Sequence, residues 1–240
     1  MIRKNLFQTY LNSAKEASTL FYKNWIVLIA AVALYFALLN LSAIFAFAGI
    51  VGSFINGLMY IAALTLFYSW LRGASPIRGY EPKELLRFDG EIFSNLLGVG
   101  FIMFLCTGLF SAVDRSLAGS QLSLFANLAL VFAVNVAPEV VLINRLDSIH
   151  AITRSFQFVR DNFIEWFIPV IVFLLPTILI APSLTLYFFA HTSPLLPTYM
   201  FYQSAKWATS LLIPILGIPI GVAFMTWVSF FRLSLFNKLG

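Results

Sequence analysis

The chain has 240 residues, of which 60% are hydrophobic and only 10% are charged, and its mean hydropathy is +0.90. A soluble domain carries roughly 25% charged residues, so these values argue against a water-soluble protein and predict that lipid surrounds much of its surface. The net charge of +5 comes from basic residues spread along the chain, without a basic run or patch. We therefore expect no nucleic-acid partner.

Six stretches of the chain are long and apolar enough to cross a membrane, which takes about 20 mostly apolar residues per helix. A tight turn at 48–50 joins the first two, and the fifth reaches at least residue 181. We therefore predict an all-α integral membrane protein with six transmembrane helices in three hairpins. In chain order, the predicted spans are 26–47, 51–71, 93–113, 122–143, 163–181 and 208–231.

The lysine and arginine residues between these spans predict their orientation. Only Arg115 and Lys206 fall on one side, and the other thirteen basic residues fall on the opposite side. The positive-inside rule places the thirteen in the cytoplasm, so both termini are predicted to be cytoplasmic. Adding or removing one span would mix the two groups, which supports the number of spans. The thirteen are Arg3, Lys4, Lys15, Lys23, Arg72, Arg78, Lys83, Arg87, Arg145, Arg154, Arg160, Arg232 and Lys238.

The segments before the odd-numbered spans are predicted to be amphipathic helices at the cytoplasmic surface of the membrane. Such helices lie with their apolar side toward the lipid and their basic side toward anionic headgroups. The apolar residues at helical spacing are Leu6, Phe7, Tyr10, Leu11, Ala14, Ala17 and Phe21, then Leu85, Leu86, Phe88, Ile92 and Phe93, and finally Ile149, Ile152, Phe156 and Val159.

Each of these segments ends with an asparagine that enters a span, namely Asn24, Asn95 and Asn162. One interpretation is a single membrane domain, 1–240, built from three repeats over 1–72, 73–145 and 146–240. The alternative is that any six-span protein with short outer loops shows such a period.

Glu139 is the most informative ionisable residue, because it follows Pro138 near the cytoplasmic end of the fourth predicted span. Asn135 lies one turn earlier on the same predicted helix. A carboxylate at membrane depth often faces a cavity, a transport pathway or a proton relay. The alternative is that Glu139 is solvated at the interface or paired with Arg145 or Arg160.

Prolines interrupt the last two predicted spans: Pro169, Pro176 and Pro182 in the fifth, and Pro214 and Pro219 in the sixth. Each proline removes a backbone donor and clashes with a carbonyl one turn earlier. We therefore expect kinks there, which line a cavity in many transporters or simply shape the helix bundle.

We expect no enzymatic activity and no cofactor. The sequence contains no H-E-x-x-H, Walker lysine, G-x-S-x-G or dinucleotide-binding motif. His150 and His191 are predicted on opposite sides of the membrane, so they do not share a metal. The outer segment 182–207 is aromatic and suits either an interfacial cap or a partial re-entry into the membrane. Catalysis on a lipid by scattered residues stays open.

Residues 137–163 carry a family resemblance. An A-P-x-x-x-L span end at 137–142, an A-x-x-R-S helix at 151–155 and an asparagine at the next span resemble the YciC-type proteins, uncharacterised bacterial inner-membrane proteins of about this length. The motif is also similar, more distantly, to the membrane domain attached to some glycerophosphodiester phosphodiesterases. The resemblance implies a bacterial inner-membrane module without hydrolytic chemistry. Arg154 and Ser155 are then candidates to hold a lipid phosphate, with simple helix anchoring as the alternative.

The leading hypothesis is a non-enzymatic inner-membrane protein whose cytoplasmic-side amphipathic helices organise lipid, in particular anionic phospholipid, or a partner membrane protein or second copy. The alternative is a transporter, or a transporter subunit, with a pathway near Glu139 and the proline-kinked spans. The candidate functional or lipid-contact residues are Glu139, Arg145, Arg154, Ser155, Arg160 and Asn135.

Overall fold

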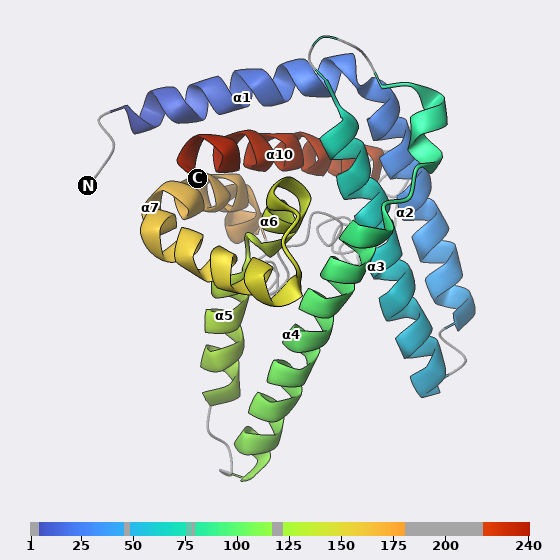
Figure 1. Cartoon of the computed structure of the whole chain (residues 1–240), viewed down its shortest axis with the longest axis vertical. Coiled ribbons are helices and arrows are strands. Elements are labelled where there is room, and N and C mark those ends of the chain that lie inside the picture. The colour runs from blue at the N-terminus through green and yellow to red at the C-terminus, as the bar shows by residue number, and fades with distance from the viewer. Residues whose placement is uncertain (1–4, 46–48, 76, 78–79, 117–121, 181–217) are drawn as a thin grey trace. The chain divides into compact units, whose positions relative to one another are not determined.

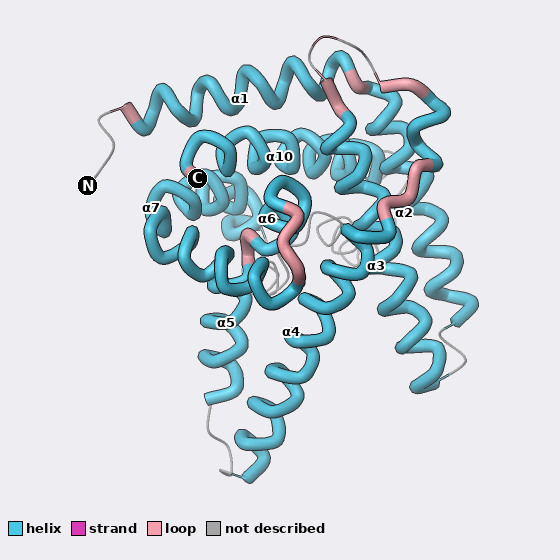
Figure 2. The backbone as a smooth tube through the Cα atoms, in the orientation of Figure 1, coloured by secondary structure: helices cyan, strands magenta, loops and turns pink. Residues whose placement is uncertain are grey.

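A computed structural model describes residues 5–45, 49–75, 77, 80–116, 122–180 and 218–240. Within these ranges every regular element is a helix (Figures 1 and 2), as predicted. Contacts group the chain into two compact units, the first formed by 1–93 with 193–240 and the second by 94–192. The single membrane domain and its three repeats concern the whole chain and stay predictions.

Three helices among the described residues are long and apolar enough to span a membrane. They are α2 (Trp25–Phe45), α3 (Gly49–Gly73) and α4 (Gly90–Ser116). The first three predicted spans lie almost entirely within them. α2 and α3 pack side by side in the first unit (Figure 1). Gly49 starts α3 with φ +56°, a left-handed conformation that glycine adopts without a steric cost.

The second amphipathic helix was predicted wrongly. Its place is taken by a short 3₁₀ helix, η2 (Pro82–Leu86), and by the start of α4. The carboxylate of Asp89 accepts hydrogen bonds from the backbone N–H groups of Glu91 at 3.2 Å and Ile92 at 3.3 Å. Because this cap begins a new helix, the apolar residues of 85–93 divide between two elements and cannot form one amphipathic face.

The fourth predicted span is not one continuous helix. It is divided into α5 (Leu122–Val134) and α6 (Ala137–Asn144), with a break at Asn135 and Val136. Pro138 stands in the first turn of α6. A proline ring clashes with the carbonyl four residues earlier, which here belongs to Val134. The proline therefore explains why α5 stops where it does.

The fifth predicted span lies within α7 (Ser148–Ile180), which also contains the third amphipathic segment. The two parts meet at a kink, where Asn162 has φ −130° and ψ 27°. Pro169 and Pro176 lie beyond this kink, and Asn162 is the residue of α7 with non-helical backbone angles. The structure thus shows a break at the asparagine that the sequence did not predict, and the kinks expected at the prolines stay a prediction.

The first amphipathic segment is α1 (Leu6–Lys23), and it packs along α10 (Ile218–Leu239) in the first unit (Figure 1). α10 includes residues 218–231 of the sixth predicted span and continues beyond it to Leu239. The rest of that span, 208–217, and the outer segment 182–207 with its aromatic residues lie outside the described residues, as do Pro182 and Pro214.

Candidate functional site

Two separate amphipathic segments, one in each compact unit, are candidate functional sites, and each leads into an apolar helical stretch. We call residues 5–24 the α1 arm and residues 147–162 the α7 arm. Both arms end at an asparagine with non-helical backbone angles, and both asparagines use the side-chain amide in the same way. Asn24 donates to the carbonyl of Leu20 at 2.8 Å, and Asn162 donates to that of Phe158 at 3.1 Å. Each amide thus bonds the last turn of its own arm, and the Leu20 carbonyl also accepts the backbone N–H of Asn24 at 2.9 Å.

Both arms also bury a pair of small side chains. In the α1 arm these are Ser13 and Ala17, and in the α7 arm they are Ala151 and Ser155, all four with no exposed surface. Each pair stands at the same two positions relative to its asparagine. Small residues one turn apart let a helix approach its neighbour closely. The α1 arm packs in this way on α10, and α7 packs on α5 and α6.

Large apolar side chains remain exposed on both arms. Phe7 and Tyr22 of the α1 arm are 75% and 78% exposed, and Ile149 and Phe156 of the α7 arm are 67% and 55% exposed. The predicted apolar stripe of the first arm is therefore only partly buried, because Ala17 has no exposed surface whereas Phe7 is largely exposed. Several large exposed apolar side chains on one segment favour contact with a membrane or another protein.

Two predicted site residues, Asn135 and Ser155, meet at the break between α5 and α6. The hydroxyl of Ser155 donates to the carbonyl of Ala133 at 2.8 Å and accepts the backbone N–H of Val136 at 3.2 Å. The indole N–H of Trp166 donates to Oδ1 of Asn135 at 2.9 Å. These bonds satisfy polar groups that the broken helix would otherwise bury. Ser155 is therefore engaged with the backbone and not placed to hold a lipid phosphate.

Glu139 lies in the first turn of α6 and is 1% exposed. The alternative of a solvated interfacial carboxylate is thus wrong. Its position is favourable for a negative charge, because the N-terminal end of a helix carries a partial positive charge. Arg145 ends the same helix in a left-handed conformation, φ 51° and ψ 38°, and is exposed. The other expected partner, Arg160, forms an ion pair of 2.9 Å with Asp161.

The start of the α7 arm is capped by Asp147. Its carboxylate accepts the backbone N–H groups of Ile149 and His150, both at 3.1 Å, and lies 2.6 Å from Nδ1 of His150. The backbone hydrogen bond from His150, aided by the bond to its ring, lowers the pKa of the Asp147 carboxyl. Arg154 stands farther along the arm and is exposed, so of the A-x-x-R-S pair only the arginine is at the surface.

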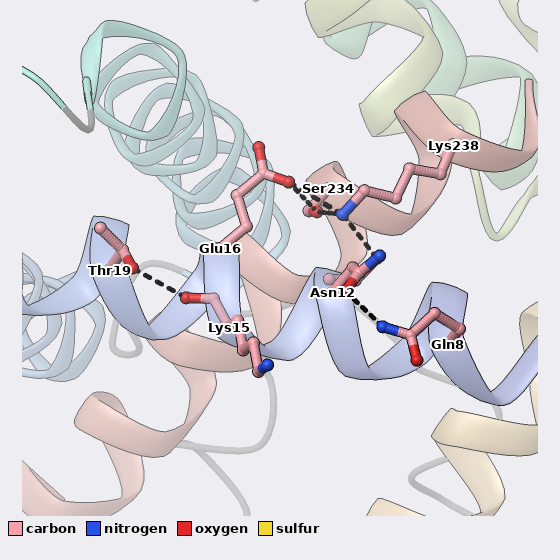
Figure 3. Close-up of polar contacts among 8 residues, drawn as sticks. Gln8, Asn12, Lys15, Glu16, Thr19, Ser234 and Lys238 are labelled. Atoms are coloured by element: carbon pink, nitrogen blue, oxygen red, sulfur yellow. Dashed lines mark hydrogen bonds and ion pairs between the residues drawn. The ribbon is translucent and has the colours of Figure 1, made fainter.

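A polar cluster between α1 and α10 was missed by the sequence analysis (Figure 3). Nζ of Lys238 lies 2.9 Å from Oε2 of Glu16, 3.0 Å from the Ser234 hydroxyl and 3.3 Å from the Ser13 hydroxyl. Ser234 also donates to Glu16 at 2.7 Å. Each residue resembles an ordinary polar residue of its own helix, and only the packing of the first helix on the last brings them together.

The same cluster shifts the pKa of Glu16. Partial burial alone would raise the pKa of this carboxyl, but the hydrogen bonds from Ser234 and Lys238 and the charge of Lys238 outweigh it, so the pKa is lowered. Farther along α1, the indole N–H of Trp227 donates to the Ser18 hydroxyl at 3.0 Å. The α1 arm is therefore held on α10 at several points along its length.

No family model, curated protein or solved structure matches this chain. The resemblance of residues 137–163 to YciC-type proteins stays a prediction. The described residues thus offer two functional features, namely the exposed apolar arms and the buried carboxylate beside a helix break.

Proposed function

We propose that this chain is a non-enzymatic protein of the bacterial inner membrane, with six transmembrane helices and cytoplasmic termini, that organises lipid or a partner membrane protein through its two arms. The observation that supports this most is the exposure of large apolar residues on segments that continue directly into apolar helices. Asn24 is followed at once by Trp25, the first residue of α2. A helix that crosses the membrane from that point keeps the α1 arm at the membrane surface.

The free energy of removing apolar side chains from water favours an arm that is covered by lipid or by another protein. Moving one large apolar side chain out of water is worth about 1.5–3 kcal/mol. Phe7 and Tyr22 on one arm, and Ile149 and Phe156 on the other, therefore give each arm several kcal/mol for contact with acyl chains or with an apolar protein surface. The two exposed cations of each arm add less than this, because one basic residue near an anionic surface contributes about 1 kcal/mol.

Single cysteines test the lipid contact. Cys106 is the one native cysteine, so a Cys106→Ser background carries one label at a time. Phe156→Cys is compared with Gln157→Cys, its exposed neighbour, each labelled with an environment-sensitive fluorophore in proteoliposomes. We expect quenchers carried on lipid to reach the label at 156 and aqueous quenchers to reach that at 157. Equal aqueous quenching at both positions rejects an arm that contacts lipid.

The topology has its own test in intact spheroplasts. With Cys106 replaced, a cysteine at Gly240 should escape a membrane-impermeant thiol reagent, whereas one at Ser120 should react. This follows because six spans place the C-terminus inside and the third-to-fourth connection outside. Reaction at Gly240 overturns the proposed orientation. Native mass spectrometry of the purified protein then distinguishes retained lipid from a second copy or a partner protein.

The burial of Glu139 favours a second candidate, a transporter or transporter subunit. Broken helices and carboxylates at membrane depth are frequent in transport pathways, and Glu139 stands one turn past the α5–α6 break. A proton pathway predicts that proteoliposomes acidify under an imposed membrane potential and that Glu139→Gln abolishes the flux. A flux equal to that of protein-free liposomes eliminates this proton pathway.

A further inference from the structure

The charges of the α7 arm are nearly balanced. The arm carries two arginines and two aspartates. One aspartate, Asp161, pairs with Arg160 at 2.9 Å, and the other, Asp147, is bonded to His150 at 2.6 Å. Arg154 is exposed on the same arm. The arm as a whole therefore has little net attraction for an anionic surface.

The α1 arm has a similar character. Its net charge is +1, from Lys15, Lys23 and Glu16, and the cation that Glu16 binds is Lys238 of α10. Much of its remaining polar surface is uncharged. Gln8 donates to Asn12 at 3.0 Å, and the hydroxyl of Thr19 donates to its own helix backbone at 2.9 Å. Helices that bind anionic lipid by charge instead carry a polar side rich in lysine and arginine.

The helices that carry the exposed apolar side chains of the arms are packed on neighbouring helices. The buried pairs Ser13 with Ala17 and Ala151 with Ser155 seat each arm on its neighbouring helix. Exposed aromatic residues, Trp25 at 61% and Phe163 at 50%, follow the two asparagines where the apolar helices begin. Each arm is thus followed by an exposed aromatic residue at the start of an apolar helix, which favours lipid as the environment of its exposed side.

From the weak net charge and the exposed apolar side chains on packed helices, we infer that the arms respond to how loosely lipid chains pack beneath the headgroups, and not to headgroup charge. This inference rests on the proposed function, in which the arms contact lipid. A fixed apolar wedge enters a bilayer only where headgroups leave a gap. Unsaturated chains and small headgroups provide such gaps, and saturated chains close them. The expected preference for anionic phospholipid then becomes secondary.

The labelled Phe156→Cys variant tests this inference in vesicles of three compositions. They are fluid saturated phosphatidylcholine, dioleoyl phosphatidylcholine with dioleoylglycerol, and dioleoyl phosphatidylcholine with phosphatidylglycerol, the last at low and at high salt. We expect lipid-borne quenching of the label to rise by about twofold or more from the saturated to the loosely packed neutral vesicles, since insertion of an uncharged wedge follows packing. Phosphatidylglycerol and salt should leave the quenching unchanged.

The outcomes separate this inference from the proposed function. Quenching that rises with phosphatidylglycerol and falls at high salt overturns the packing inference and leaves a lipid-binding arm. Quenching that is the same in all vesicles also overturns it. A label that lipid-borne quenchers reach in none of them overturns the proposed function itself. The matched pair Tyr22→Cys and Lys23→Cys repeats the measurement on the α1 arm, so the result does not depend on the folding of one variant.

Discussion

The ammonium group of Lys238 lies 2.9 Å from Oε2 of Glu16, which ties the last turn of the chain to the first helix. Their side chains are 31% and 49% exposed, so water screens much of the attraction. Exposed pairs of this kind contribute about 0.2–1 kcal/mol. The hydroxyls of Ser13 and Ser234 accept hydrogen bonds from the same ammonium group, so the cluster helps to hold the α1 arm on α10.

The lowered pKa of Glu16 predicts how the contribution of this cluster to stability depends on pH. A carboxyl with a depressed pKa in the folded state stabilises the fold above its unfolded pKa, and this contribution is lost as the pH falls through the folded pKa. Glu16→Gln should therefore destabilise the protein by about 0.2–1 kcal/mol at neutral pH and have no effect in acid. Thermal unfolding in detergent, followed by tryptophan fluorescence, measures both values.

Lys15→Gln is the matched control, because Lys15 is the exposed neighbour of Glu16 on α1. We expect it to change the free energy of unfolding by less than about 0.5 kcal/mol at either pH. An effect of Glu16→Gln that is the same at neutral and acid pH would show that the ionised carboxylate does not stabilise the docked arm.

The Ser155 hydroxyl makes a second prediction, because it satisfies both a carbonyl and an N–H at the α5–α6 break. Ser155→Ala leaves the buried N–H of Val136 without this acceptor, at a cost of about 1–3 kcal/mol. Thr153→Ala is the control, since the exposed hydroxyl of Thr153 bonds only its own helix at 3.0 Å. Denaturant titration in detergent compares the free energies of unfolding of the two variants. Equal losses would show that the Ser155 hydroxyl does not stabilise the α5–α6 break.

Local hydropathy was enough to predict the long apolar helices. α2, α3 and α4 coincide with mostly apolar stretches that are long enough to cross a membrane, where a helix pairs its backbone groups within one segment. The spacing of apolar residues likewise predicted α1 and the first part of α7. These elements depend on residues close in sequence, so a sequence pattern contains the information that specifies them.

The break in the fourth predicted span could not be read from hydropathy. Residues 122–143 are apolar on both sides of it, and the group that stabilises it, Ser155, belongs to the next helix. Asn135 was predicted as a polar residue within an apolar span and Ser155 as part of the A-x-x-R-S motif, but the sequence did not reveal that both lie at a helix break. Glu16 and Lys238 are near opposite ends of the chain, so no local pattern relates them.

Gly98 of α4 makes a third prediction. A Cβ atom there would meet the side chain of Ser148, whose hydroxyl donates to the carbonyl of Asn95 at 3.0 Å. Gly98→Ala should therefore push α4 and α7 apart locally and cost about 1–3 kcal/mol. Gly108 lies on the same helix, and a Cβ atom there would meet nothing within 4 Å, so Gly108→Ala should be neutral or stabilise by up to about 1 kcal/mol. Similar melting temperatures for the two variants would contradict this close approach.

The asparagines at the ends of the two arms make the last prediction. Asn24 donates to the carbonyls of Leu20 and Ser75, at 2.8 and 3.2 Å, whereas Asn162 donates to one carbonyl. Asn24→Ala should thus cost more than Asn162→Ala, both within about 0.5–3 kcal/mol because the lost bonds are partly buried. The third asparagine of the sequence pattern, Asn95, accepts the Ser148 hydroxyl through its backbone carbonyl, which alanine retains. Asn95→Ala should therefore lower the free energy of unfolding by less than either of the other two substitutions. Equal losses for all three would show that the side-chain amide bonds of Asn24 and Asn162 do not stabilise the junction between arm and span.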